Sequence, residues 1–150
     1  MRLLNYRTVL GAIAVAVLAL VLIGPLSGPR CTLLRGADTL SVPLNSIIKG
    51  TASFFCYRDS AGENLRFVLA RGVDGKVRSV FDACRQCYRY HKGFSASHGQ
   101  IICRLCGNRY PIKRMMAGSA SCAPVPLKIA IRGRRVTVKV SDVRKGQWLF

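Results

Sequence analysis

The feature that most constrains this chain is a pair of Cys-x-x-Cys motifs. Cys84 and Cys87 form the first motif and Cys103 and Cys106 the second, with 15 residues between them. Two residues between cysteines allow one tight turn to present both sulfurs on the same side. Gly107 directly follows the second pair, where such a turn reverses and a positive φ is needed. Two such turns brought together form a tetrahedral site with four sulfur ligands, and the spacing lies within the range of structural zinc sites.

The spacing leaves the metal open, because several metals bind four thiolates. Zinc, iron in a rubredoxin-like site and an iron–sulfur cluster all accept these ligands. Two alternatives without a metal also fit: disulfides within or between the pairs, and a catalytic dithiol. The dithiol is disfavoured because neither pair stands at the start of a helix that follows a strand. Covalent haem attachment is disfavoured because Tyr88 and Gly107, rather than histidines, follow the two pairs.

The other cysteines and the two histidines have more open interpretations. Seven cysteines are an odd number, so they cannot all pair as disulfides. Cys122 precedes a proline-rich run that can fix its approach to the same metal; it can also serve a larger cluster, a second metal or a disulfide. Cys56 lies in an expected strand and is interpreted as a buried thiol, with pairing to Cys31 as the alternative. His91 and His98 lie in a basic, polar segment and are interpreted as solvated.

The first 30 residues predict a membrane anchor. Residues 8–26 are apolar and number 19, so a helix at about 1.5 Å per residue spans roughly 28 Å, close to the hydrocarbon thickness. No good small-x-small cleavage site follows. We expect a single-pass anchor with its flank at 1–30 and a tether at 31–38. Arg2 and Arg7 favour a cytoplasmic amino terminus, which places the domain outside the cytoplasm, where thiols tend to be oxidised.

Short runs rich in aromatic and β-branched residues predict strands for most of the remaining chain. The runs are 51–58, 64–71, 76–83, 127–132 and 135–140. Asp74-Gly75 and Gly133-Arg134 supply tight turns between neighbouring runs. The expected fold class is mainly β. Residues 39–150 form a small antiparallel domain in which 84–122 is an irregular, metal-binding insertion.

The charge of the chain concerns its partners rather than its fold. Lys and Arg number 24 against 6 Asp and Glu, a net charge of +18. Such a surface attracts acidic proteins or anionic lipid heads. Nucleic acid is an unlikely partner for a domain outside the cytoplasm. The chain shows no Ser-His-Asp arrangement, no carboxylate pair near the cysteines and no phosphate-binding loop, so an enzyme is the class with least support.

The order of the motifs resembles the membrane iron–sulfur FtrD-like domain family. The matching features are a DGK turn leading into FDACRQCY, then KGF, ICRLCGNRYPI and SCAPVPL, and the likeness extends over residues 39–150. The resemblance implies a bacterial, membrane-attached domain with an iron–sulfur centre. Its relatives accompany ferrous-iron uptake systems, in which iron oxidation needs an electron acceptor. By position, the implied metal ligands are Cys84, Cys87, Cys103, Cys106 and Cys122.

Two hypotheses for function arise from these features. The first is a membrane-anchored metal–thiolate protein for electron transfer or iron handling on the periplasmic face of the cytoplasmic membrane. It would contain an iron–sulfur cluster or iron, and an acidic cytochrome or cupredoxin-like protein would be its electron partner. The second is a non-catalytic accessory subunit of a membrane-protein complex, in which structural zinc joins the cysteine segment to the sheet.

Overall fold

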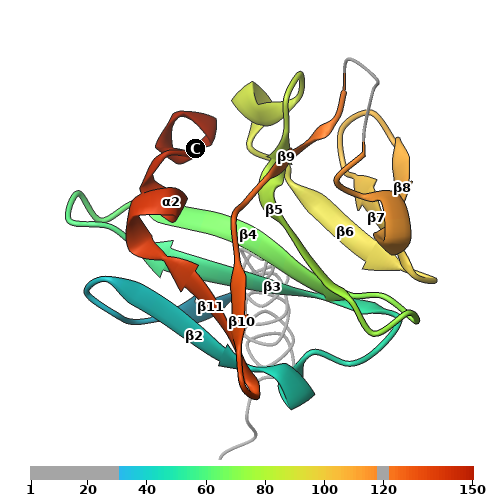
Figure 1. The fold of residues 1–150 in the computed structure, drawn as a ribbon. Coiled ribbons are helices and arrows are strands. Elements are labelled where there is room, and N and C mark those ends of the chain that lie inside the picture. The colour runs from blue at the N-terminus through green and yellow to red at the C-terminus, as the bar shows by residue number, and fades with distance from the viewer. Residues whose placement is uncertain (1–30, 118–121) are drawn as a thin grey trace, which may run out of the picture.

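The computed structural model describes residues 31–117 and 122–150, which form a mainly β structure of three sheets (Figure 1). The largest sheet has the strand order β1-β3-β4-β5-β9. Its strands are β1 (Thr32–Leu34), β3 (Thr51–Arg58), β4 (Asn64–Arg71), β5 (Val77–Cys84) and β9 (Pro124–Pro126). The expected antiparallel β architecture is therefore confirmed for the described residues.

The centre of this sheet is the predicted meander of β3, β4 and β5. β3 and β4 match the predicted runs, and β5 begins one residue later than predicted. Between β4 and β5, Gly75 has a φ of 77° and its N–H donates to the Gly72 carbonyl at 2.9 Å. The Asp74 carboxylate accepts the N–H of Lys76 and pairs with Arg78 at 2.8 Å, which fixes the turn.

A second sheet, in the order β10-β11-β2, packs over the first. Its strands are β10 (Ala130–Arg132), β11 (Arg135–Lys139) and β2 (Thr39–Pro43). In β11, Val136 and Val138 alternate inward, and in β2 Leu40 and Val42 do the same. These four side chains join Phe67 and others in one apolar core, and full burial of each contributes about 1.5–3 kcal/mol. The β10–β11 hairpin forms where it was predicted, although β10 begins three residues later and β11 ends one residue earlier than the predicted runs. β2 was not predicted as a strand.

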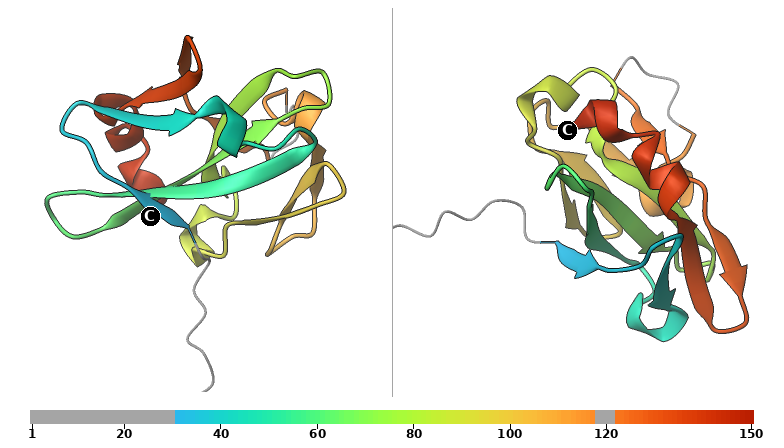
Figure 2. Two further views of the ribbon diagram at one scale, coloured as in Figure 1. Left: turned by 90° about the horizontal axis from the view of Figure 1, so that it is seen from below. Right: turned by 90° about the vertical axis from the view of Figure 1, so that its left-hand side faces the viewer.

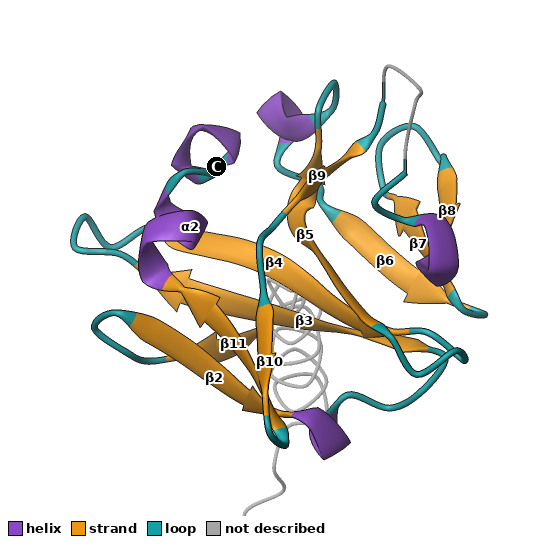
Figure 3. Cartoon of the chain, in the orientation of Figure 1, coloured by secondary structure: helices purple, strands orange, loops and turns teal. Residues whose placement is uncertain are grey.

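The helical segments are short and lie between strands and at the carboxyl end (Figure 3). They are η1 (Leu44–Ser46), η2 (Tyr88–Tyr90), η3 (Ile112–Arg114), α2 (Val140–Arg144) and η4 (Gln147–Leu149). Among residues 31–117 and 122–150, no helix has the length and apolar character that a membrane crossing requires. The span predicted at 8–26 lies outside the described residues.

The cysteine segment contains a third sheet, which corrects the expectation of an irregular insertion. Its strands are β6 (Phe94–Ser97), β7 (Gln100–Cys103) and β8 (Arg109–Pro111), in antiparallel order. The β6–β7 turn is the pair His98-Gly99, with φ values of 47° and 70°. A two-residue hairpin of this kind needs a positive φ at both positions. Because histidine is an uncommon choice for the first position, sequence patterns did not indicate the turn. Figures 1 and 2 show that this sheet and the β10–β11 hairpin lie on opposite sides of the domain.

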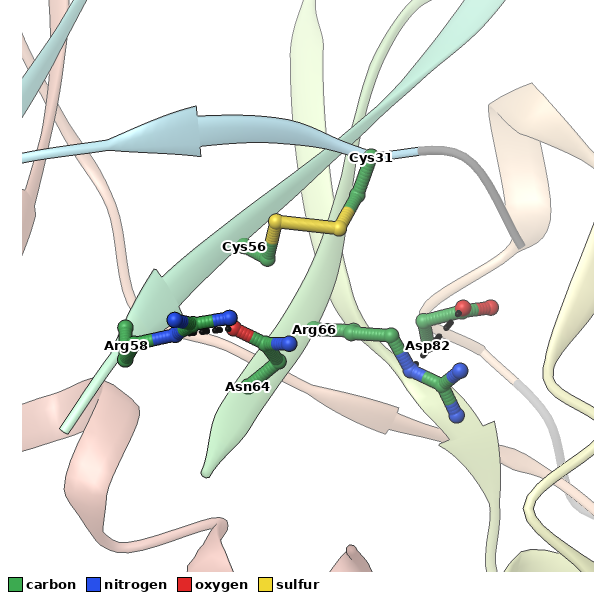
Figure 4. Close-up of a disulfide and its surroundings, with 6 residues drawn as sticks. All are labelled: Cys31, Cys56, Arg58, Asn64, Arg66 and Asp82. Carbon is green, nitrogen blue, oxygen red and sulfur yellow. Dashed lines mark hydrogen bonds and ion pairs between the residues drawn. A yellow bond between two sulfur atoms is a disulfide. The ribbon is translucent and has the colours of Figure 1, made fainter. Parts of the chain in front are cut away.

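Residues 32–34, within the segment expected to be a tether, instead form β1 and pair in parallel with β3. This pairing sets Leu33 opposite Cys56, and Cys31 forms a disulfide with Cys56 (Figure 4). Cys56 is buried, as expected, but it is not a free thiol. The alternative pairing is the one observed, because β1 and β3 hold the two Cα atoms 5.7 Å apart.

Removing this disulfide by the double substitution Cys31→Ser/Cys56→Ser is expected to lower the free energy of unfolding by about 3 kcal/mol. The bond closes a loop with a sequence separation of 25, and its loss restores conformational freedom to the unfolded chain. Urea unfolding of the full-length protein in detergent, followed by Trp148 fluorescence, measures the change. An unchanged urea midpoint, or wild-type protein whose Cys31 and Cys56 both react with a thiol reagent, would contradict the pairing.

Candidate metal centre

Five cysteine sulfurs gather where the largest sheet meets the small β6–β8 sheet. The sulfurs of Cys84, Cys87, Cys103 and Cys122 all lie within 4.8 Å of one another. The Cys106 sulfur lies 3.2 Å from the Cys122 sulfur, and the Cys87 sulfur lies 3.5 Å from it. The structure thus brings together the four cysteines of the paired motifs and the fifth candidate, with Cys122 in contact with three of the others.

Backbone hydrogen bonds form the two turns that carry the paired motifs. In the first turn, the N–H of Cys87 donates to the carbonyl of Cys84 at 3.1 Å. In the second, the N–H of Gly107 donates to the carbonyl of Cys103 at 2.9 Å, and Gly107 has a φ of 73°. A residue with a side chain rarely adopts this conformation. The expected role of Gly107 in reversing the second turn is confirmed.

Cys122 reaches the cluster because β9 pairs with β5. This pairing sets Cys84 opposite Pro124, and the N–H of Arg85 donates to the carbonyl of Ala123 at 2.9 Å. In the structure Cys84 and Cys122 are joined as a disulfide. The described residues contain no disulfide within a Cys-x-x-Cys pair or between the two pairs. Of the roles left open for Cys122, the disulfide is the one observed.

The three remaining thiols differ in exposure and in pKa. Cys103 is buried, Cys87 is half-buried and Cys106 is exposed. Burial, together with the neighbouring thiols of Cys106 and Cys103, raises the pKa of Cys87 to about 12. Burial also acts to raise the pKa of Cys106, but the N–H of Asn108 and the two neighbouring thiols outweigh it, so this pKa is lowered. Negative charge in the cluster therefore resides first on Cys106, at the surface.

Tyr110 on β8 places a buried hydroxyl beside the cluster. Its ring packs edge-to-face with Phe94, with centroids 6.1 Å apart. Burial raises the pKa of Tyr110, and the negative charges of nearby cysteine thiolates raise it further. The Asn108 side chain opposes this shift, although its contact with the hydroxyl lies outside hydrogen-bonding geometry. The hydroxyl has no hydrogen-bond partner within residues 31–117 and 122–150, so it is a donor available to a nearby sulfur.

Asp82 supports the cluster from the β5 side. Its carboxylate accepts the N–H of Phe94 at 2.6 Å and lies 3.7 Å from the Nε of Arg66 (Figure 4). Burial raises the pKa of Asp82 to about 6, against the lowering effects of Phe94, Arg66 and Arg104. Gly93 packs against the same carboxylate, and a Cβ there would approach its oxygens to 2.6 Å. This contact explains the glycine of the KGF tripeptide, for which sequence analysis offered no physical reason.

The two histidines do not belong to the sulfur group. His91 and His98 adopt left-handed backbone conformations, with φ values of 51° and 47°. In the described residues, the potential metal-binding group consists of cysteines alone. Both histidines therefore serve as turn residues, consistent with their interpretation as non-ligands.

The arrangement of donors fits a thiolate-bound metal. Four tetrahedral sulfurs with metal–sulfur bonds of about 2.3 Å lie roughly 3.8 Å apart, and the observed group falls within 4.8 Å. An all-sulfur set suits zinc, iron and iron–sulfur clusters and is poorly suited to magnesium or calcium. Loading such a site requires reduction of the Cys84–Cys122 bond: two electrons and two protons convert the disulfide into two thiols, which lose their protons on binding metal.

Most of the chain matches one known protein family. Residues 47–150 match the model of the family described as membrane iron-sulfur containing protein FtrD-like. The chain belongs to this FtrD-like family. Its cysteine cluster and the family's description together indicate a metal-binding, membrane-associated protein.

Other comparisons give more distant likenesses or none. No curated protein matches the chain. Among solved structures, the chain is similar to the quaternary ammonium Rieske monooxygenase CntA, crystallised with an inhibitor, at 13% identity and a TM-score of 0.43. The match covers 75% of this chain and 32% of that chain, so this chain spans less than half of the monooxygenase's length.

Proposed function

We propose that this FtrD-like protein transfers electrons for iron handling through a metal–thiolate centre at the outer face of the cytoplasmic membrane. The observation that carries this proposal is the five-sulfur cluster, in which four sulfurs lie within 4.8 Å and a further thiol, Cys106, reaches the surface. A bound iron centre would supply one-electron redox chemistry, whereas zinc would supply none. Cys84, Cys87 and Cys103 would hold the metal. The fourth ligand would be Cys122, which completes the close group, or Cys106, whose sulfur lies 3.2 Å from that of Cys122.

The protein's own groups would tune such a centre. The N–H of Asn108 is a donor to the Cys106 sulfur, and the unpartnered Tyr110 hydroxyl lies within electrostatic range of the cysteines. Hydrogen bonds to sulfur stabilise the more negative, reduced state and raise the reduction potential. The surface position of Cys106 would shorten the path from a partner to a bound metal.

An extracytoplasmic location is supported by the disulfide chemistry. The bond between Cys31 and Cys56 lies in the ordered sheet, far in sequence from the metal motifs. Disulfides of this kind persist in oxidising compartments and are rare in the cytosol. The apolar stretch at 8–26 would anchor the domain, with the amino terminus in the cytoplasm and the domain in the periplasm.

The charge of the chain supports an acidic electron partner. A net charge of +18 would steer an acidic cytochrome or cupredoxin-like protein toward the domain. Leu105, next to the exposed thiol, is 42% exposed and offers an apolar contact at the same place. Association through such a surface weakens as salt is added.

A structural zinc site is the second candidate, favoured by the position of the cysteines. Cys84 ends β5 of the largest sheet, whereas Cys103 ends β7 of the small sheet. A metal bound by both would add a bonded link between two sheets that already share a buried apolar cluster, which includes Val80 and Phe94. In this case the protein would be a non-catalytic accessory subunit of a membrane-protein complex.

Anaerobic purification of the full-length protein in detergent, with elemental analysis and a visible spectrum, separates the two candidates. Electron transfer requires stoichiometric iron and sulfur-to-iron charge-transfer bands that dithionite bleaches. Stoichiometric zinc without colour would reject electron transfer and favour the structural subunit. Reduced protein that retains no metal would contradict both.

Replacing Tyr110 by Phe is expected to lower the reduction potential of the iron-loaded protein by roughly 40 mV, the equivalent of one hydrogen bond of about 1 kcal/mol. The substitution removes the hydroxyl and keeps the ring that packs on Phe94. Protein-film voltammetry measures the shift. Tyr57→Phe is the matched control, because Tyr57 is also buried but packs in the other core cluster. Equal potentials in the two variants would show that Tyr110 does not contact the centre.

A further inference from the structure

The outer face of the β10–β11–β2 sheet contains a shallow hollow of about 180 Å³. Small side chains form its floor: Ala130 pairs with Thr137 across the two strands, and Thr39 begins the neighbouring strand. The alternation of β11 produces this floor. Val136 and Val138 point into the core, so Thr137 and Lys139 face outward. The Thr137 hydroxyl donates to the Ala130 carbonyl at 3.2 Å, which holds the floor in place.

Three cations line the hollow: Lys128, Arg132 and Lys139. Within residues 31–117 and 122–150, none of the three takes part in an ion pair; the pairs present are Arg66–Asp82, Arg78–Asp74 and Lys145–Asp142. By contrast, the nearby Arg135 is occupied, because its guanidinium donates to the hydroxyl and the carbonyl of Ser41. These three cations are therefore available to bind an anionic ligand.

The single carboxylate at the rim does not neutralise this charge. Asp142 accepts a hydrogen bond from the ammonium of Lys145 at 2.6 Å. That bond lowers the pKa of Asp142, and the charges of Lys128 and Lys139 lower it further. The two lysines thus lie close enough to act together electrostatically. With Asp142 paired to Lys145, which is outside the lining, the hollow keeps an excess of positive charge.

We propose that this hollow binds a phosphate group, carried by an anionic membrane lipid or free in solution. A phosphate offers several acceptor oxygens and one to two negative charges, which match one guanidinium and two ammonium groups. The volume admits a phosphate with part of its attached headgroup.

The hollow and the cysteine cluster are separate sites. None of the cysteines lines the hollow, so a phosphate bound there leaves the cysteine sulfurs free for a soluble partner.

The test uses the full-length protein in a neutral detergent and phosphate-free buffer, with two probes. Inorganic phosphate is titrated by calorimetry, and phosphatidylglycerol is added at increasing ratios and counted by native mass spectrometry, with phosphatidylcholine as the uncharged comparison. The triple variant Lys128→Gln/Arg132→Gln/Lys139→Gln removes the lining cations. We expect its dissociation constant for the bound probe to rise at least about tenfold, because the phosphate loses all three of its cationic contacts.

A control variant removes the same charge elsewhere. Arg109→Gln/Lys113→Gln/Arg114→Gln alters three exposed cations near the small β6–β8 sheet, and its affinity is expected to stay within twofold of wild type. If the hollow variant, unlike the control variant, loses phosphatidylglycerol binding, the hollow is a lipid site. If the hollow variant, unlike the control variant, loses only inorganic phosphate binding, the hollow is a site for free phosphate. Binding of neither probe to wild type, equal weakening in both variants, or equal binding of the two lipids would overturn the proposal.

Discussion

The pairing of β5 with β9 is the constraint on which the cysteine cluster depends. It sets Cys84 opposite Pro124 and so places Cys122 beside the first cysteine pair, although 38 residues separate the two in sequence. The β6–β7 hairpin then sets Phe94 opposite Cys103, while the Phe94 N–H is bound by Asp82 on β5. One buried carboxylate thus connects the small sheet to the large one next to the sulfurs. Burial of this charge is costly, and its hydrogen bond and the Arg66 guanidinium offset part of that cost.

Local patterns predicted the parts of the fold that local interactions form. The β3–β4–β5 meander and the β10–β11 hairpin follow from alternation of apolar residues and from glycines at tight turns. The missed elements depend on partners distant in sequence. β2 has only Leu40 and Val42 as an alternating signal and forms because β11 provides its partner. β1 is held by parallel pairing with β3 and by the Cys31–Cys56 disulfide, neither of which a single sequence specifies.

In the candidate site, too, the sequence predicts the local turns but not the contacts between segments distant in sequence. The spacing of Cys84 with Cys87 and of Cys103 with Cys106 predicts two turns, and both form, each closed by a backbone hydrogen bond. The close approach of Cys122, its bond to Cys84 and the buried hydroxyl of Tyr110 result from strand register, which the spacing does not encode. The structure adds a chemical condition to the metal hypothesis: the five sulfurs form either one disulfide with three thiols or a reduced set that binds metal. Redox state and metal loading are therefore linked in the same cluster.

The central claim is that these cysteine sulfurs are the ligands of a metal. X-ray absorption spectroscopy at the metal K-edge of the full-length protein, purified without air and kept reduced, tests it most directly. A metal bound by the cysteines gives a first shell of about four sulfur atoms near 2.3 Å, without nitrogen or oxygen ligands. A shell dominated by nitrogen or oxygen would place the metal elsewhere in the chain and contradict the account.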